Sequence, residues 1–224
     1  MKRREIGDLP VFRFLRVLGD LMAANWLWIL CSLPIVTIGP ATCALFTVTL
    51  KLAKDEPFGL LRTWFNAFRE NFKRGLVIGL GAIALLIVAV TDFIFALGQG
   101  VELLRKLFIV VSVVVLCVLL TVICYTFALQ ARFSNSLKGH IKNTFLLTVC
   151  CPGWTILMAV IYVLPILGLI LWPEMFLYVL GFLYLMMGIS GPTFLASFVL
   201  KHVFARFGDQ EQELPEEDNW TLEE

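Results

Sequence analysis

The chain has 224 residues, of which 59% are hydrophobic and 16% charged, and its mean hydropathy is +0.88. Soluble globular domains are less apolar, so this composition excludes an ordinary soluble domain and favours an integral membrane protein. The formal net charge is only +1, although residues 208–224 carry eight acidic residues and no basic one. We expect residues 1–207 to form a single transmembrane helical domain and residues 208–224 an acidic, disordered C-terminal tail.

The first long apolar run, residues 21–53, is too long for one membrane crossing and contains helix breakers. Pro34 and the pair Gly39-Pro40 interrupt it. Proline lacks a backbone N–H and glycine costs helix stability, so both favour a break. The run therefore predicts a helical hairpin with its turn at the outer face. Because a mixed polar segment follows the basic N-terminal residues, we expect no cleaved signal peptide.

Four further runs have the lengths of membrane-spanning helices. Residues 76–97 and 107–131 are long enough to cross a hydrocarbon core of roughly 30 Å at about 1.5 Å per residue. Residues 154–172 and 175–200 also contain glycine or proline. The last run exceeds one upright crossing, so we expect it to break at residues 188–192 or to emerge into the cytoplasm.

The placement of lysine and arginine predicts how the chain is threaded. With a cytoplasmic N-terminus, sixteen of the 18 basic residues fall in inner segments, and only Arg105 and Lys106 lie outside. Cytoplasmic loops of membrane proteins carry such an excess. The sequence therefore predicts an all-α, polytopic transmembrane helical bundle with about six crossings, or five plus a re-entrant hairpin, and with both termini cytoplasmic. This threading explains the basic residues without a nucleic-acid partner.

Three inner segments are amphipathic, and we expect them to be interfacial helices at the cytoplasmic side. The strongest covers residues 56–74, in which apolar residues recur at spacings of three and four between basic ones. Shorter patterns of this kind lie near residues 8–20 and 134–146. Such helices either brace the bundle, dock a partner or sense lipid headgroups. The candidate interface residues are Phe65, Phe68, Arg69, Phe72 and Lys73.

Helix breakers and intramembrane polar residues are candidates for a functional site. Asp92 is the only acidic or basic residue well inside a predicted span, which makes it a functional candidate, although its shallow position also fits a solvated carboxylate near Arg105 and Lys106. GPATCALF at 39–46 resembles GPTFLASF at 191–198, through internal duplication or convergent use of a kink. The candidate intramembrane residues are Asn25, Pro34, Gly39, Pro40, Asp92, Gly191 and Pro192.

Glycines at the start of the apolar run 76–97 favour close helix packing. Gly75 and Gly79 form a G-x-x-x-G pattern, which lets the backbones of two helices approach each other.

The sequence contains no motif that predicts catalysis. His140 and His202 show no metal-ligand spacing, and the six cysteines fall in or beside apolar runs, where we expect buried small hydrophobic residues. Phosphate-binding loops, dinucleotide fingerprints and nucleophile elbows are missing, and we expect no cluster of polar residues within the spans. We therefore expect a non-enzymatic protein with no catalytic, cofactor-binding or metal-binding residues and no cofactor.

The opening FRFLRVLGDLMAANWLWILCSLPIVTIGPATCALFTVTLKL, followed by FRENFKRG, resembles the YesL family of bacterial integral membrane proteins. The residues that carry the resemblance are Gly19-Asp20, Asn25, Leu27-Trp28, Leu33-Pro34, Thr37, Gly39-Pro40-Ala41-Thr42, Ala44-Leu45 and Asn71-Phe72. The resemblance implies a multi-pass protein of the bacterial cell membrane without an established activity. Family members are often encoded beside carbohydrate-uptake systems and sensor-regulator pairs, which implies an accessory role in sugar import or its regulation.

Two functions follow as expectations. The first is an integral membrane accessory or interaction protein that binds the lipid bilayer and a partner such as a carbohydrate-uptake permease or membrane sensor. The alternative is a small secondary transporter or channel for an unidentified solute, with Asn25, the two Gly-Pro breaks and Asp92 near its path. Both leave room for a homo-oligomer.

Overall fold

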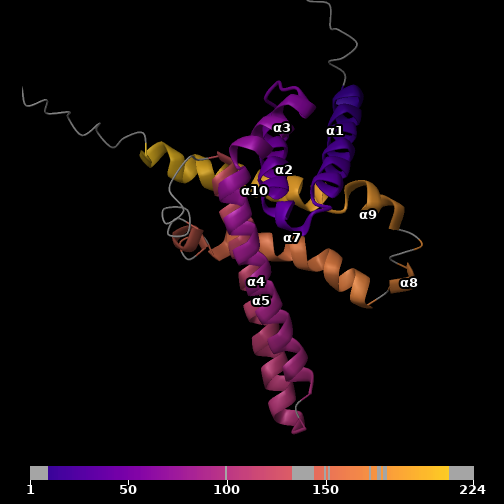
Figure 1. The fold of residues 1–224 in the computed structure, drawn as a ribbon, viewed down its shortest axis with the longest axis vertical. Helices are drawn as coiled ribbons and strands as arrows, with labels where there is room; N and C mark the ends of the chain where they lie inside the picture. Colours follow the sequence, from indigo (N-terminus) through magenta and orange to yellow (C-terminus); the bar gives the residue numbers. More distant parts are fainter. Residues whose placement is uncertain are drawn as a thin grey trace, which may run out of the picture.

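The computed structural model describes residues 10–98, 100–132, 144–148, 150, 152–171, 173–175, 178 and 181–211, and the regular structure among them is helical, as predicted. The helices are α1 (Pro10–Cys31), η2 (Ile35–Thr37), α2 (Ile38–Lys54), α3 (Leu60–Glu70), α4 (Phe72–Leu97), α5 (Glu102–Arg132), α7 (Pro152–Leu171), α8 (Pro173–Met175), α9 (Gly181–Met187) and α10 (Ser190–Glu211). Figure 1 shows α1, α2 and α3 at one end of the long axis and the α4–α5 hairpin reaching to the other end. Helices α7 and α10 run across this axis, so the helices do not form a simple parallel bundle.

Helices α1 and α2 form the hairpin predicted for the first apolar run. Helix α1 ends at Cys31, and the chain turns through residues 32–37. The Thr37 hydroxyl stabilises this turn by donating to the carbonyl oxygen of Cys31 (2.6 Å) or Pro34 (2.7 Å). Pro40 lies in the first turn of α2, where its missing N–H costs no helical hydrogen bond. The breakers therefore end one helix and begin the next.

Helix α2 ends in a Schellman motif at Asp55. This residue is left-handed, with a φ of 60°. Its N–H donates to the Leu52 carbonyl oxygen (3.1 Å), and the N–H of Glu56 donates to that of Lys51 (3.1 Å). The turn reverses the chain, so that α3 packs back along α2.

The structure divides two of the predicted interfacial segments differently from the sequence analysis. Residues 56–74 divide into α3, which ends at Glu70, and the start of α4 at Phe72. Asn71 caps α3 locally, because its backbone N–H and its side-chain amide each lie 3.0 Å from the Ala67 carbonyl oxygen. Residues 8–20 form no separate helix, since α1 runs unbroken from Pro10. The third predicted segment, 134–146, lies mostly outside the described residues.

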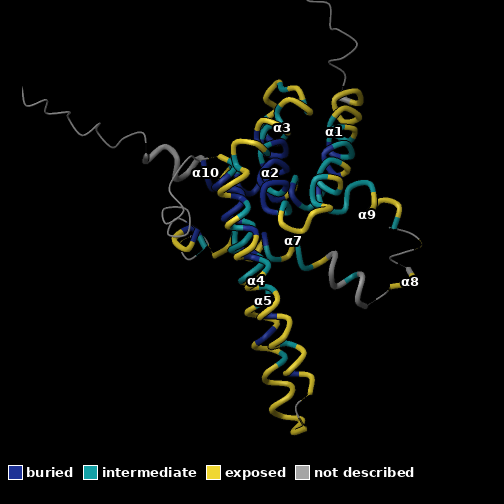
Figure 2. Tube along the Cα trace, in the orientation of Figure 1, coloured by how far each residue is buried: buried dark blue, intermediate teal, exposed yellow. Residues whose placement is uncertain are grey.

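Helices α4 and α5 pack side by side as a long hairpin. Beyond Gly79, the buried residues of α4 are Ala82, Ala89 and Ala96, each seven residues from the next. This spacing keeps a stripe of small residues against a neighbouring helix. From Gly79, α4 continues for about 27 Å to Leu97 at 1.5 Å per residue. Figure 2 shows that the far end of this hairpin is largely exposed, in contrast to α2.

The core of the protein surrounds α2. One cluster of buried side chains joins α2 to α5, α7 and α10 and includes Phe46, Tyr125 and Phe204. A second cluster joins α2 to α1 and α3 and centres on Trp64. Both clusters are dark blue in Figure 2, and α2 contributes to each of them. Helix α2 is therefore the central element against which the other helices are placed.

The last predicted span is broken, as expected. Helices α9 and α10 meet at a 57° bend at residues 188–189. A Cβ atom at Gly188 would lie 2.8 Å from the ring of Tyr184 and overlap that residue's carbonyl oxygen, so the bend requires glycine. Helix α10 extends to Glu211, which corrects the predicted disordered tail at its start: residues 208–211 are helical.

Four described helices are long and apolar enough to cross a membrane: residues 11–31, 35–54, 72–97 and 102–132, or five if the bent α9–α10 pair counts as one span. The apolar part found for α7 is shorter, Pro152–Leu164. The six crossings and the orientation of the termini therefore stay predictions.

Candidate functional site

Asn25 of α1 holds the break between α9 and α10. Its side chain is 1% exposed. Its amide nitrogen donates to the Leu185 carbonyl oxygen (2.9 Å), and its amide oxygen accepts hydrogen bonds from the N–H groups of Ile189 (3.1 Å) and Ser190 (3.2 Å). The first N–H groups of a helix have no partner within the helix. One side chain therefore satisfies both sides of the bend.

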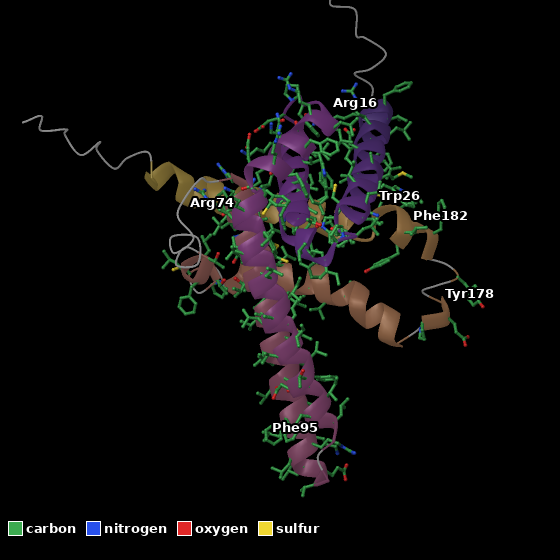
Figure 3. The ribbon with its side chains drawn as sticks, viewed as in Figure 1. Arg16, Trp26, Arg74, Phe95, Tyr178 and Phe182 are labelled. Carbon is green, nitrogen blue, oxygen red and sulfur yellow. The ribbon has the colours of Figure 1, made fainter. Side chains whose placement is uncertain are left out.

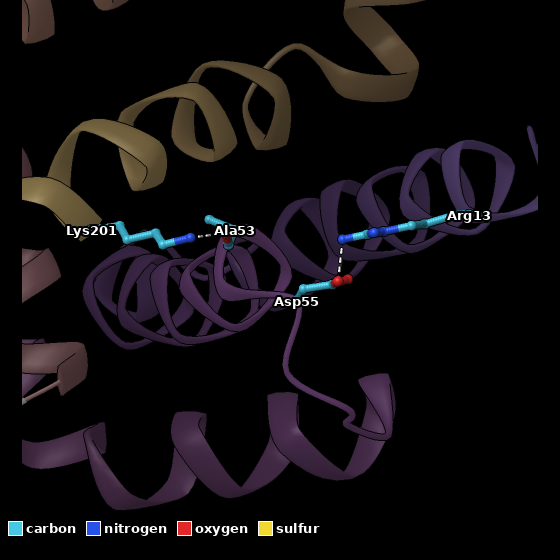
Figure 4. A network of polar contacts seen from close by, with 4 residues as sticks. All are labelled: Arg13, Ala53, Asp55 and Lys201. Carbon is cyan, nitrogen blue, oxygen red and sulfur yellow. Dashed lines mark hydrogen bonds and ion pairs between the residues drawn. The ribbon is translucent and has the colours of Figure 1, made fainter. Parts of the chain in front are cut away.

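A buried polar seam continues from this break along α2 and α10. The Ser197 hydroxyl lies 2.9 Å from that of Thr49, and both residues are fully buried. Further along, Lys201 Nζ donates to the Ala53 carbonyl oxygen (3.3 Å), which Figure 4 shows at the C-terminal end of α2. We expected no polar cluster within the spans. The structure differs from that expectation, because folding brings together polar residues that are far apart in the sequence.

An ion pair at the same end of α2 lies at the surface. Arg13 of α1 pairs with Asp55, as Figure 4 shows. Both side chains are more than half exposed, so the pair contributes little to stability.

The first Gly-Pro break is a helix crossing. A Cβ atom built on Gly39 would overlap the Gly75 carbonyl oxygen, and one built on Gly79 would lie 2.8 Å from the Gly39 Cα. A Cβ atom on Gly75 would lie 3.0 Å from the Pro40 Cα. The G-x-x-x-G pattern therefore allows the close packing that we predicted, here between α4 and the start of α2.

Another polar contact links the start of α4 to the end of α5. The Gln130 side chain is 3% exposed and donates to the Asn71 side-chain oxygen at 2.9 Å. This bond joins the turn after α3 to the last turns of α5. It holds the base of the α4–α5 hairpin against the core.

Asp92 lies apart from these contacts. Figure 3 labels Phe95, one turn beyond Asp92, near the far end of the hairpin, whereas Trp26, the neighbour of Asn25, lies in the other half of the molecule. The Ser112 hydroxyl of α5 donates to Asp92 Oδ2 at 2.7 Å. Lys106 pairs with Glu102 (2.7 Å).

The candidate residues therefore fall into separate places. Asn25 and Gly191 lie at or beside the α9–α10 break, Gly39 and Pro40 lie at the α4 crossing, and Asp92 lies on the distal hairpin. Pro34 belongs to the turn between α1 and α2, and Pro192 lies in the first turn of α10. No sequence pattern pointed to Thr49, Ser197, Gln130 and Ser112, because single neutral residues in apolar helices carry no recognisable signal.

The described cysteines differ in burial. Cys43 is buried, as expected for a small hydrophobic residue, but Cys150 is exposed, which contradicts that expectation. Among the residues that the structure describes, no group of three or more His, Cys, Asp or Glu side chains is placed to hold a metal ion.

The described helices that are long and apolar enough to cross a membrane indicate a helical membrane protein. Residues 21–93 match the family model described as "Protein of unknown function, DUF624". The chain is 29% identical over 141 residues to "Uncharacterized protein YesL" of Bacillus subtilis (strain 168), and the match covers 60% of this chain and 65% of that protein. These two matches confirm the predicted resemblance to a YesL-like family of unknown function. No solved structure matches the chain.

Proposed function

We propose that the protein is an integral membrane interaction protein that binds a second membrane component through the outer face of α3. The division of α3 into two faces supports this proposal. Trp64 and Ala67 are buried in the cluster that joins α3 to α2, so the helix is already anchored to its own chain. Leu61 and Phe65 nevertheless expose 59% and 54% of their surface.

Basic residues flank this exposed apolar surface. Arg62 and Arg69 are exposed on α3, and Lys73 and Arg74 follow at the start of α4. Aromatic and arginine side chains are enriched where proteins bind one another, and exposed apolar patches often mark such sites. Four of the five predicted interface residues are exposed. The fifth, Phe68, packs partly against the cluster around Trp64.

A carbohydrate-uptake permease or a membrane sensor is suggested by the family resemblance alone. The family resemblance supports a location in the bacterial cell membrane. The distribution of lysine and arginine supports cytoplasmic positions for both termini.

The test is a comparison of co-purified proteins from cells with native expression levels. The double variant Phe65→Ser, Arg69→Glu changes the exposed face and spares Phe68, so we expect membrane insertion to persist and the partner to be lost. Glu70→Gln, at an exposed position about 140° around the same helix from Phe65, is the control and should retain the partner. Equal recovery of the partner with both variants would contradict the proposal.

A transporter is the second candidate, supported by the broken α9–α10 pair. Broken helices line substrate sites in many transporters. Ser190 Oγ is buried at this break, with no hydrogen-bond partner among the described residues. Reconstituted protein should then carry a sugar or an ion across vesicles, and Asn25→Ala should reduce the flux. Absence of flux across a broad solute panel would count against a transporter.

A further inference from the structure

One side of α4 carries a shallow groove near the far end of the α4–α5 hairpin. The groove is lined by Ile87, Val88, Thr91, Asp92 and Phe95. Successive members are one or three residues apart, which places them on one stripe of a helix. A stripe of this kind is the seam that a helix presents to a second helix.

The stripe contains an acid in apolar surroundings. Its partner Ser112 lies six residues beyond Lys106 on α5, about 9 Å further from the polar end of the hairpin. Asp92 therefore lies inside the apolar part of the hairpin, near its polar end. Ser112 supplies one neutral donor, whereas an ionised carboxylate has about four acceptor positions. Acids within a membrane are costly unless they are paired or reached by water.

The described part of the chain leaves this stripe uncovered. Figures 1 and 2 show α4 and α5 alone at this end of the long axis. Val88 and Ile87 are 66% and 62% exposed. Asp92 is also exposed. A stripe that contains an acid is therefore exposed on a helix that is long and apolar enough to cross a membrane.

We infer that this stripe seats a transmembrane helix of a partner protein, and that the partner helix carries a lysine or arginine level with Asp92. The inference rests on the proposed interaction function and adds a second contact surface to it. The charge of Asp92 distinguishes three possible occupants of the stripe, namely lipid chains, a second copy of this chain and a cationic partner helix. Lipid chains offer the carboxylate no donor, and a second copy joined through the same stripe would bring two Asp92 carboxylates together. A cationic partner helix neutralises the acid and fills the seam.

Site-specific photocrosslinking tests this inference in cells with native expression levels. A photoreactive amino acid replaces either Val88, on the stripe, or Val90, which is also exposed but lies about 200° away around the helix. We expect the Val88 probe to capture a membrane protein at a segment containing lysine or arginine, and the Val90 probe not to capture it. Asp92→Asn should reduce capture on the order of tenfold, and Asp92→Glu should retain it.

A charge exchange completes the test. Asp92→Lys should abolish capture, and replacement of the captured basic residue by aspartate should restore it. Capture of a second copy alone, capture of lipid alone, or capture that Asp92→Asn leaves unchanged would overturn the inference. The Val88 and Val90 probes leave Asp92 unchanged. This part of the test therefore does not depend on whether an Asp92 variant folds.

A third probe at Phe65 separates this inference from the proposed function. Capture of a partner at Phe65 but not at Val88 would overturn the inference and support the α3 surface. Capture at Val88 but not at Phe65 would support the inference and contradict the α3 surface. Capture at neither position would contradict both.

Discussion

The glycine crossing between α2 and α4 predicts opposite effects for two alanine substitutions that lie two residues apart. A Cβ atom at Gly79 would lie 2.8 Å from the Cα and 3.0 Å from the N of Gly39, and both are backbone atoms that cannot rotate away. A Cβ atom at Gly81 has no neighbour within 4 Å. Both positions lie in the same helix, so Gly81→Ala is a matched control for Gly79→Ala.

The magnitudes follow from two opposing terms. Replacing a helical glycine by alanine stabilises a helix by about 1 kcal/mol at either position. Inserting a methyl group into a packed contact costs about 1–3 kcal/mol, because the two helices must separate. We therefore expect Gly81→Ala to raise the free energy of unfolding by about 1 kcal/mol. Gly79→Ala should be about 1–3 kcal/mol less stable than Gly81→Ala.

The assay is unfolding of the purified variants in one detergent, followed by tryptophan fluorescence. Trp64 is fully buried in the neighbouring cluster, so its emission should report loss of packing. Equal unfolding midpoints for the two alanine variants would refute the reasoning, because they would show that α2 and α4 do not cross at backbone contact. A lower midpoint for Gly81→Ala than for Gly79→Ala would refute it as well.

Three further predictions concern other contacts. Asn25→Leu removes three hydrogen bonds to the α9–α10 break, so we expect the free energy of unfolding to fall by about 2–4 kcal/mol and amide exchange at residues 189–190 to become faster. Unchanged amide protection there would show that Asn25 does not hold the break. In a double-mutant cycle, Thr49→Val and Ser197→Ala should show a coupling of about 0.6–1.7 kcal/mol, whereas additive effects would show that the two hydroxyls do not interact. Asp55→Gly and Asp55→Ala both remove the ion pair with Arg13, but alanine keeps the left-handed strain at this position. The glycine variant should therefore be about 1 kcal/mol more stable in thermal unfolding. The reverse order would be inconsistent with the observed φ.

Local patterns in the sequence predicted much of the helical arrangement. The breakers in residues 21–53 predicted the α1–α2 hairpin, because proline and glycine act on the backbone within one turn. The excess length of the last span predicted its break, and G-x-x-x-G predicted a close helix approach. Each of these features depends on residues that are neighbours in the chain.

Features that depend on long-range contacts could not be predicted. Asn25 meets Ser190 across 165 positions, and nothing near Asn25 indicates that partner. Helical periodicity in residues 56–74 placed its apolar residues on one face, but it could not show that α3 buries Trp64 or that Asn71 ends the helix. The location of Asp92 on an uncovered stripe depends likewise on which helices reach the far end of the hairpin.

The glycine crossing also sets the direction in which the α4–α5 hairpin leaves the core. Backbone atoms meet there without interlocking side chains, whereas the distal hairpin is a stiff pair of helices held by a seam of alanines. Asp92 lies 13 residues beyond Gly79, about 20 Å along α4. A rotation of roughly 10° at the crossing would move Asp92 by about 3 Å. The angle at which α4 crosses α2 therefore determines where Asp92 lies, and a small difference in that angle is amplified along the hairpin.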